Sequence, residues 1–81
     1  MKITLLYFAQ FYDAMGKRTE EIELPEETTI RRFYNTLLDR PDRKTLRDLP
    51  VRFAVNEDVV NDNFVLKNGD CLAILPPVAG G

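Results

Sequence analysis

The chain has 81 residues, a formal net charge of −2 and no histidine. That length fits one small domain, too small to hold both a core and a deep private active site, and the interleaving of basic with acidic residues argues against a nucleic-acid surface. Because histidine is the commonest general base and metal ligand, its absence argues against self-contained hydrolysis or metal chemistry, so we expect a carrier or binding module that is not catalytic alone.

The first third of the chain predicts two strands separated by a helical turn. Residues 2–8 are apolar and favour a strand. Residues 9–15 form a helical turn that Gly16 stops. Residues 19–24 alternate between polar and apolar side chains and close at Pro25, which predicts a second strand, antiparallel to the first. The core-facing positions of the two strands are Ile3, Leu5, Ile22 and Leu24.

One segment has the spacing of a helix with a single buried face. Thr28 or Thr29 is a suitable N-cap, and Pro41 ends the helix. The apolar residues after the cap recur at intervals of three and four, which is typical of an amphipathic helix. They are Ile30, Phe33, Tyr34, Leu37 and Leu38.

Beyond the helix, we expect a polar connection over residues 39–50, in which only Leu46 and Leu49 are anchored. Residues 51–55 predict a third strand, and residues 59–60 a short fourth one after a turn.

The last strand follows a tight-turn signal at Asn68-Gly69 and covers residues 70–75. It contains the single cysteine, Cys71, which rules out an internal disulfide and any two-cysteine redox motif. Without a histidine to activate it, Cys71 is interpreted as a small strand residue and not as a nucleophile.

This order of elements indicates an α+β fold of the β-grasp type, with a mixed sheet packed on one main helix. In that arrangement the first and last strands lie side by side and parallel at the centre of the sheet. We expect residues 1–75 to form the domain and residues 76–81 to form an extended tail. No signal-peptide pattern or apolar run of about 18 residues is present, which predicts a soluble, cytoplasmic protein without a membrane partner.

The tail is the most informative part of the sequence. Two prolines favour a stiff, extended segment, and two glycines without Cβ atoms can pass through a narrow channel. At roughly 3.3 Å per residue, the tail would carry the terminal carboxylate about 20 Å from the domain. Gly81 is therefore the candidate reactive residue, although a frayed terminus is the alternative. The residues that would carry Gly81 are Pro76, Pro77, Val78, Ala79 and Gly80.

The sheet face away from the helix is also predicted to carry apolar residues. Alternation along the first, third and last strands directs several such side chains to that face, next to the tail. A contiguous apolar patch on a small domain typically marks a docking surface. The alternative is that these are ordinary scattered residues partly covered by the segment after the first strand. The predicted partner-binding residues are Leu6, Phe8, Ala54, Ala73 and Leu75.

Two polar stretches are interpreted as surface. Residues 56–63 are rich in oxygen ligands but lack the spacing and central glycine of a calcium loop, so we expect turns and no metal site. Residues 20–27 are acidic, which suits an exposed strand edge that resists aggregation.

The whole chain resembles the small, sulfur-carrying subunits of molybdopterin synthase, a branch of the ubiquitin-like sulfur carriers. The most specific match is Leu66-Lys67-Asn68-Gly69-Asp70, followed by the segment Ala73 to Gly81 with its Pro-Pro-Val and Gly-Gly. Tyr7-Phe8-Ala9 and Ala54-Val55-Asn56 add weaker support. Tyr12 and Cys71 depart from the family pattern, which often has an arginine and an acidic residue there.

This resemblance implies a sulfur carrier of molybdenum cofactor biosynthesis with a ubiquitin-like β-grasp fold. An E1-like activating enzyme would use ATP to join the Gly81 carboxylate to AMP, and sulfur would then replace AMP to leave a thiocarboxylate. The carrier would bind no cofactor of its own, and would dock on the large synthase subunit to deliver sulfur to a cyclic pyranopterin. Three alternatives remain: a thiamin-pathway sulfur carrier, a ubiquitin-like modifier conjugated through Gly81, and a plain binding domain with an inert end.

Overall fold

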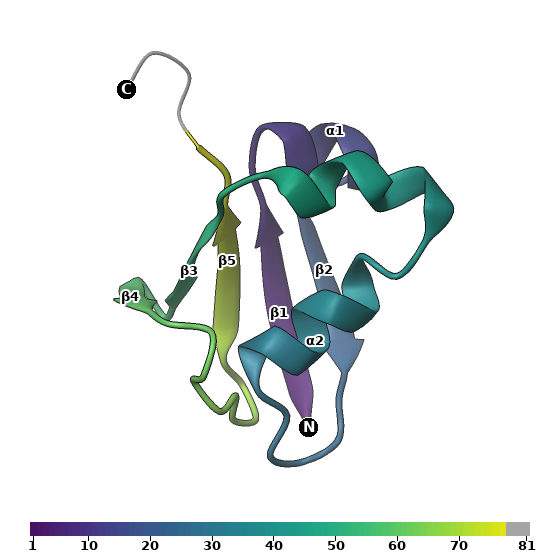
Figure 1. Cartoon of the computed structure of the whole chain (residues 1–81). Helices are drawn as coiled ribbons and strands as arrows, with labels where there is room; N and C mark the ends of the chain where they lie inside the picture. The colour runs from purple at the N-terminus through teal and green to yellow at the C-terminus, as the bar shows by residue number, and fades with distance from the viewer. Residues whose placement is uncertain (78–81) are drawn as a thin grey trace.

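The computed structural model describes residues 1–77 and shows one mixed sheet of five strands in the order β2-β1-β5-β3-β4 (Figure 1). The predicted α+β class and β-grasp arrangement are confirmed. In chain order the strands are β1 (Lys2–Tyr7), β2 (Thr19–Glu23), β3 (Arg52–Val55), β4 (Asp58–Val60) and β5 (Cys71–Leu75).

Three helical segments accompany the sheet: α1 (Gln10–Met15), α2 (Ile30–Leu37) and the 3₁₀ helix η1 (Pro41–Asp48). Figure 1 shows α2 lying across one face of the sheet, while η1 crosses near the strand ends beside α1. In the described part of the chain, no helix has the length and apolar character needed to cross a bilayer.

The first and last strands form the parallel centre of the sheet, as predicted. Leu5 of β1 lies opposite Leu72 of β5, and Tyr7 lies opposite Ile74. β5 also pairs with β3 in antiparallel orientation, so it has a hydrogen-bonded neighbour on each side. Residue 76 directly follows this strand. The tail therefore starts from a central strand that is hydrogen-bonded on both sides.

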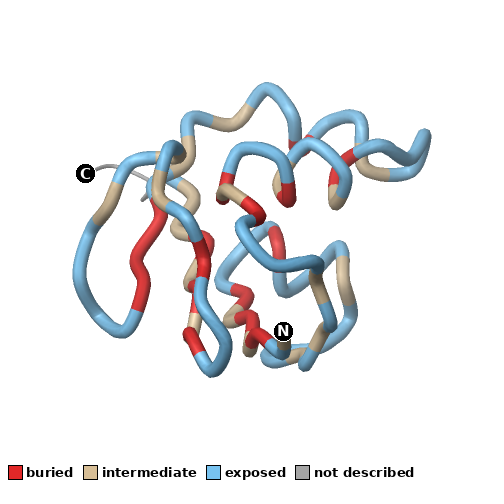
Figure 2. The backbone as a smooth tube through the Cα atoms, turned by 90° about the horizontal axis from the view of Figure 1, so that it is seen from below, coloured by how far each residue is buried: buried red, intermediate tan, exposed pale blue. Residues whose placement is uncertain are grey.

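The core lies between the sheet and the helices. Figure 2 shows the buried positions on the strands and on the inner turns of the helices, with most of the loops exposed. Complete burial of one large apolar side chain stabilises the fold by roughly 1.5–3 kcal/mol. The side chains with no exposed surface are Ile3, Leu5, Phe11, Ile30, Leu72 and Ile74.

Side-chain hydrogen bonds cap both ends of the main helix, α2. Oγ1 of Thr29 accepts a hydrogen bond from the backbone N–H of Arg32 over 3.2 Å, so Thr29 is the N-cap. At the other end, Arg43 donates to the Leu37 carbonyl at 2.8 Å and Arg47 donates to the Leu38 carbonyl at 3.0 Å. These bonds satisfy carbonyls that the last helical turn leaves without partners.

The polar connection predicted over residues 39–50 contains a helix that the sequence analysis did not identify, because Pro41 starts η1. A 3₁₀ helix has three residues per turn and lacks the 3.6-residue apolar period that marks an α-helix, so the pattern concealed it. The two predicted anchors are confirmed: Leu46 is buried and Leu49 packs partly buried against the core.

Two predicted turns also form. Gly16 follows α1 with a left-handed backbone, φ 73°, and its N–H donates to the Tyr12 carbonyl. Gly69 has φ 89° in the turn before β5. Each strand differs from the sequence prediction by one residue at one end. For example, β1 ends at Tyr7 because the carbonyl of Phe8 already accepts the N–H of Phe11, at 3.0 Å.

Candidate functional site

The tail begins where β5 ends. Leu75 and Pro76 are half-buried and Pro77 is exposed. The remaining predicted tail residues, Val78, Ala79, Gly80 and Gly81, lie outside the described residues, so their role stays a prediction. The structure does define the residues that precede them, which are the end of β5 and the two prolines.

A row of apolar side chains crosses the sheet on the face away from α2. Leu6 lies opposite Ala73, Ala73 opposite Ala54, and Ala54 opposite Val59. Because directly opposed residues point to the same side of a sheet, the four side chains form one continuous row over β1, β5, β3 and β4. We call this surface, together with Phe8, Arg52, Cys71 and Leu75, the outer face.

The structure brings the five predicted docking residues together on this face, although they differ in exposure. Phe8 is 45% exposed, whereas Ala54 is only 7% exposed. Leu6, Ala73 and Leu75 are half-buried. Phe8 and Leu6 therefore offer contact area, while the two alanines keep the surface flat.

Sequence reasoning missed two residues of the face, Val59 and Arg52. Val59 is 67% exposed and continues the apolar row. The two-residue turn at Asn56-Glu57, both with positive φ, pairs Val55 with Asp58 and so places Val59 opposite Ala54. The Asn-Glu turn is a weak signal, because glycine is usual at such positions.

Phe8 separates two grooves at the end of the sheet from which the tail starts. The larger, of about 910 Å³, is called the tail groove. Its lining includes Phe8, Pro50, Arg52, Leu75, Pro76 and Pro77. The smaller, of about 320 Å³, is called the Tyr12 groove. Its lining includes Leu6, Phe8, Tyr12, Arg18 and Thr19. Docking of a partner over Phe8 would therefore cover both grooves.

The backbone directly after Phe8, between β1 and α1, has an uncommon conformation. Ala9 has φ 48° and ψ −120°, a region that side chains other than glycine rarely adopt. Such a residue typically raises the free energy of the folded state by about 1–3 kcal/mol and is common near functional sites. The N–H groups of Phe11 and Tyr12 both point to the carbonyl of Phe8, at 3.0 and 3.4 Å. This conformation is thus fixed by the start of α1.

The raised pKa values of Tyr7 and Tyr34 exclude these two side chains as bases at neutral pH. Burial, reinforced by a hydrogen bond to Glu20, raises the pKa of Tyr7 well above its usual value. Burial raises the pKa of Tyr34 to about 12. Both hydroxyls therefore stay protonated at neutral pH.

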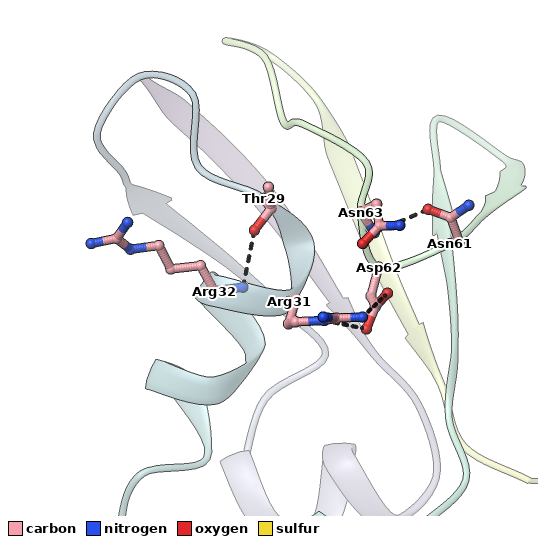
Figure 3. A network of polar contacts seen from close by, with 6 residues as sticks. All are labelled: Thr29, Arg31, Arg32, Asn61, Asp62 and Asn63. Atoms are coloured by element: carbon pink, nitrogen blue, oxygen red, sulfur yellow. Dashed lines mark hydrogen bonds and ion pairs between the residues drawn. The ribbon is translucent and has the colours of Figure 1, made fainter.

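The oxygen-rich segment is occupied by internal contacts (Figure 3). Arg31 donates to both carboxylate oxygens of Asp62, at 3.0 and 3.2 Å, and Asn61 accepts the N–H of Asn63 at 3.0 Å. These contacts link the start of α2 to the segment after β4. Within residues 1–77, no group of three or more His, Cys, Asp or Glu side chains is placed to hold a metal ion.

The arrangement is therefore a rigid sheet with an apolar outer face and a tail that starts beside it. Such an arrangement suits the docking of a partner next to the start of the tail.

Comparison with known proteins gives matches over the whole chain. The family described as ThiS family matches residues 5–81. The molybdopterin synthase sulfur carrier subunit of Homo sapiens is 31% identical over 84 residues, covering 99% of this chain and 94% of that protein.

Solved structures share the fold. The putative molybdopterin converting factor, subunit 1, from Pyrococcus furiosus has a TM-score of 0.80 and 30% identity, covering 96% of this chain and 99% of that chain. A chain in the complex of subunit 1 and 2 of molybdopterin-converting factor from Helicobacter pylori has a TM-score of 0.69 and covers 100% of both chains. Its identity of 23% shows a common fold alone.

Proposed function

The chain belongs to the ThiS family, whose pattern covers it from residue 5 to its last residue, and we propose that it is the sulfur carrier subunit of a molybdopterin synthase. The observation that carries the proposal is the full-length similarity to molybdopterin synthase sulfur carrier subunits. The geometry supports it, because the central strand β5 leads directly into the segment that ends in Gly-Gly.

The chemistry begins at the carboxylate of Gly81. It attacks the α-phosphate of ATP on an E1-like activating enzyme, forming an acyl adenylate and releasing pyrophosphate. A persulfide sulfur then displaces AMP, and a thiol cleaves the resulting acyl disulfide to leave the thiocarboxylate. Each of these steps requires groups supplied by the partners, and the carrier contributes its terminus and its docking surface.

The loaded carrier then delivers its sulfur on the large subunit of the synthase. The outer face docks on that subunit, and the tail reaches the bound cyclic pyranopterin. Burial of Phe8 and Leu6 supplies the apolar part of the contact, and Ala54 and Ala73 allow close approach. Two deliveries provide the two sulfur atoms of the dithiolene.

The human relative and the Pyrococcus furiosus structure are named for molybdopterin synthesis, which favours this function over the thiamin-pathway alternative. A ubiquitin-like modifier would use the same activated terminus but would form amide bonds with lysines. The two outcomes differ in mass, so one measurement separates them.

The test is the intact mass of the protein isolated from its host. A C-terminal thiocarboxylate replaces one oxygen with sulfur and increases the mass by about 16 Da, whereas lysine-linked adducts indicate a modifier. Pyrophosphate exchange with the activating enzyme then compares the parent with a chain lacking Gly81. Removing one residue shifts the carboxylate by more than about 3 Å, so exchange should be lost. Exchange and thiocarboxylate formation by the shortened chain would contradict the proposal.

A further inference from the structure

The end of the outer face from which the tail starts carries two arginines without ionic partners. Arg18 and Arg52 form no ion pair and donate no side-chain hydrogen bond to any other residue in the described range 1–77. Three other arginines, Arg31, Arg40 and Arg47, each contact an aspartate. Arg18 and Arg52 differ in this from those three arginines, and they share the lack of a side-chain partner in the described residues with Arg32 on α2.

Both guanidinium groups lie beside the predicted anchor, Phe8. Arg52 lies opposite Leu75 in the sheet and lines the tail groove. Arg18 lines the Tyr12 groove, and its guanidinium carbon lies 5.2 Å from the centre of the Tyr12 ring. That stacking restricts the side chain of Arg18 and holds its charge at the groove.

One acidic residue, Asp13, lines the tail groove together with Arg52. It forms no ion pair with Arg52 in the described residues, and it also lines a depression between α1 and η1. At the opposite end of the face, Glu21 is within 3.9 Å of Lys2. Arg18 and Arg52 thus carry positive charges without an ion pair in the described residues where the tail starts, whereas Lys2 and Glu21 are paired at the other end of the face.

A partner that buries Phe8 must also cover the grooves on both sides of it, and with them both guanidinium groups. Covering a charge without a counter-charge is strongly unfavourable, so carboxylates of the partner at both positions would favour docking. Charge pairs of this kind mainly set orientation and association rate.

We propose that Arg18 and Arg52 orient the carrier on the large synthase subunit, by pairing with carboxylates on either side of the pocket that receives Phe8. The inference rests on the proposed function, because it names the chemistry of the surface on which the carrier docks. The two charges direct the tail-bearing end of the sheet toward an acidic rim on the partner.

The experiment measures binding of the complete carrier to the purified large subunit. Arg18→Glu and Arg52→Glu should each weaken the affinity about tenfold, mainly through a slower association rate, and the double variant about a hundredfold. Arg32→Glu is the matched control, because Arg32 is exposed on α2, away from the outer face, and its side chain has no partner in the described residues. It should change the affinity less than about twofold.

Two further arms sharpen the result. Arg52→Lys keeps the charge and should retain most of the affinity, which separates charge from shape. Raising the salt concentration should weaken the parent more than the double variant, because the variant has lost the screened attraction. Circular dichroism of each variant verifies the fold.

Equal effects of Arg32→Glu and Arg52→Glu would overturn the inference, since net charge alone would then explain them. Unchanged affinity of the double variant, or weakened binding to the activating enzyme only, would also overturn it. If the parent carries a thiocarboxylate and transfers sulfur while the arginine variants bind normally, only this inference fails. If the parent carries no thiocarboxylate and does not bind the large subunit, the proposed function fails with it.

Discussion

The side-chain amide of Asn56 donates a hydrogen bond to Oδ1 of Asp70 over 3.0 Å. The other carboxylate oxygen of Asp70 accepts the N–H of Lys67 at 2.8 Å, and Oδ1 of Asn56 accepts the N–H of Cys71 at 3.0 Å. The turn after β3 is thereby joined to the turn before β5. This contact fixes the position of the central strand at the end of the sheet opposite the tail.

Asp70→Ala should therefore reduce stability. Asp70 is 9% exposed, and the substitution leaves the donors on Asn56 and Lys67 without their partner. The expected loss in the free energy of unfolding is about 1–3 kcal/mol, measured by urea denaturation. Asp58→Ala at the neighbouring turn is the control, because Asp58 is exposed, and it should change stability by less than about 0.5 kcal/mol. Equal effects of the two substitutions would show that the Asn56 contact is not responsible.

Phe8→Glu should weaken docking without unfolding the domain. Phe8 is 45% exposed, and a buried apolar anchor at an interface typically contributes at least about 2 kcal/mol. Calorimetric titration with the large subunit should thus show a loss of about thirtyfold or more in affinity. The matched control is Val65→Glu, at a residue that is 43% exposed but pairs with Thr29 beside α2. If Val65→Glu is equally harmful, the outer face is not the docking surface.

Cys71→Ser should retain sulfur transfer. Cys71 is a half-buried strand residue on the outer face, and its backbone N–H and carbonyl are both used in contacts with Asn56. Those backbone contacts do not depend on the thiol. The measurement is single-turnover sulfur delivery by the thiocarboxylated variant. A loss of turnover in a folded variant would indicate that the thiol, and not Gly81, carries the sulfur.

Tyr7→Phe should reveal a pH-dependent contact. Tyr7 donates a hydrogen bond to Oε1 of Glu20 over 2.8 Å, and this bond is the main reason that the pKa of Glu20 is lowered. A lowered carboxylate pKa adds stability above the unfolded value of about 4.3, and the gain is lost as the pH falls through the folded value.

At pH 7 the Tyr7→Phe variant should therefore be less stable than the parent by about 1 kcal/mol, and the difference should shrink below about pH 4. Tyr12→Phe is the control, because the Tyr12 hydroxyl makes no side-chain hydrogen bond within residues 1–77. Thermal unfolding across this pH range measures the difference. A difference that does not change with pH would refute the role of Glu20.

Much of the fold follows from local sequence patterns. Alternation of apolar and polar residues identifies β1 and β2, and the spacing from Ile30 to Leu38 identifies α2, because each pattern reflects burial on one side of a regular element. The reactive role assigned to Gly81 also comes from the sequence alone, since that residue lies outside the described part of the chain.

The tertiary structure decided the relations between distant segments. The register that sets Val59 opposite Ala54 depends on the Asn56-Glu57 turn, and Arg52 lies opposite Leu75 only because β3 pairs with β5. Local periodicity indicates which face of the sheet a side chain occupies, but it does not indicate which residue of the neighbouring strand lies opposite. That register depends on turn geometry and on packing of the whole sheet. For this reason the sequence predicts an apolar outer face, while the two arginines beside the tail are visible only in the folded molecule.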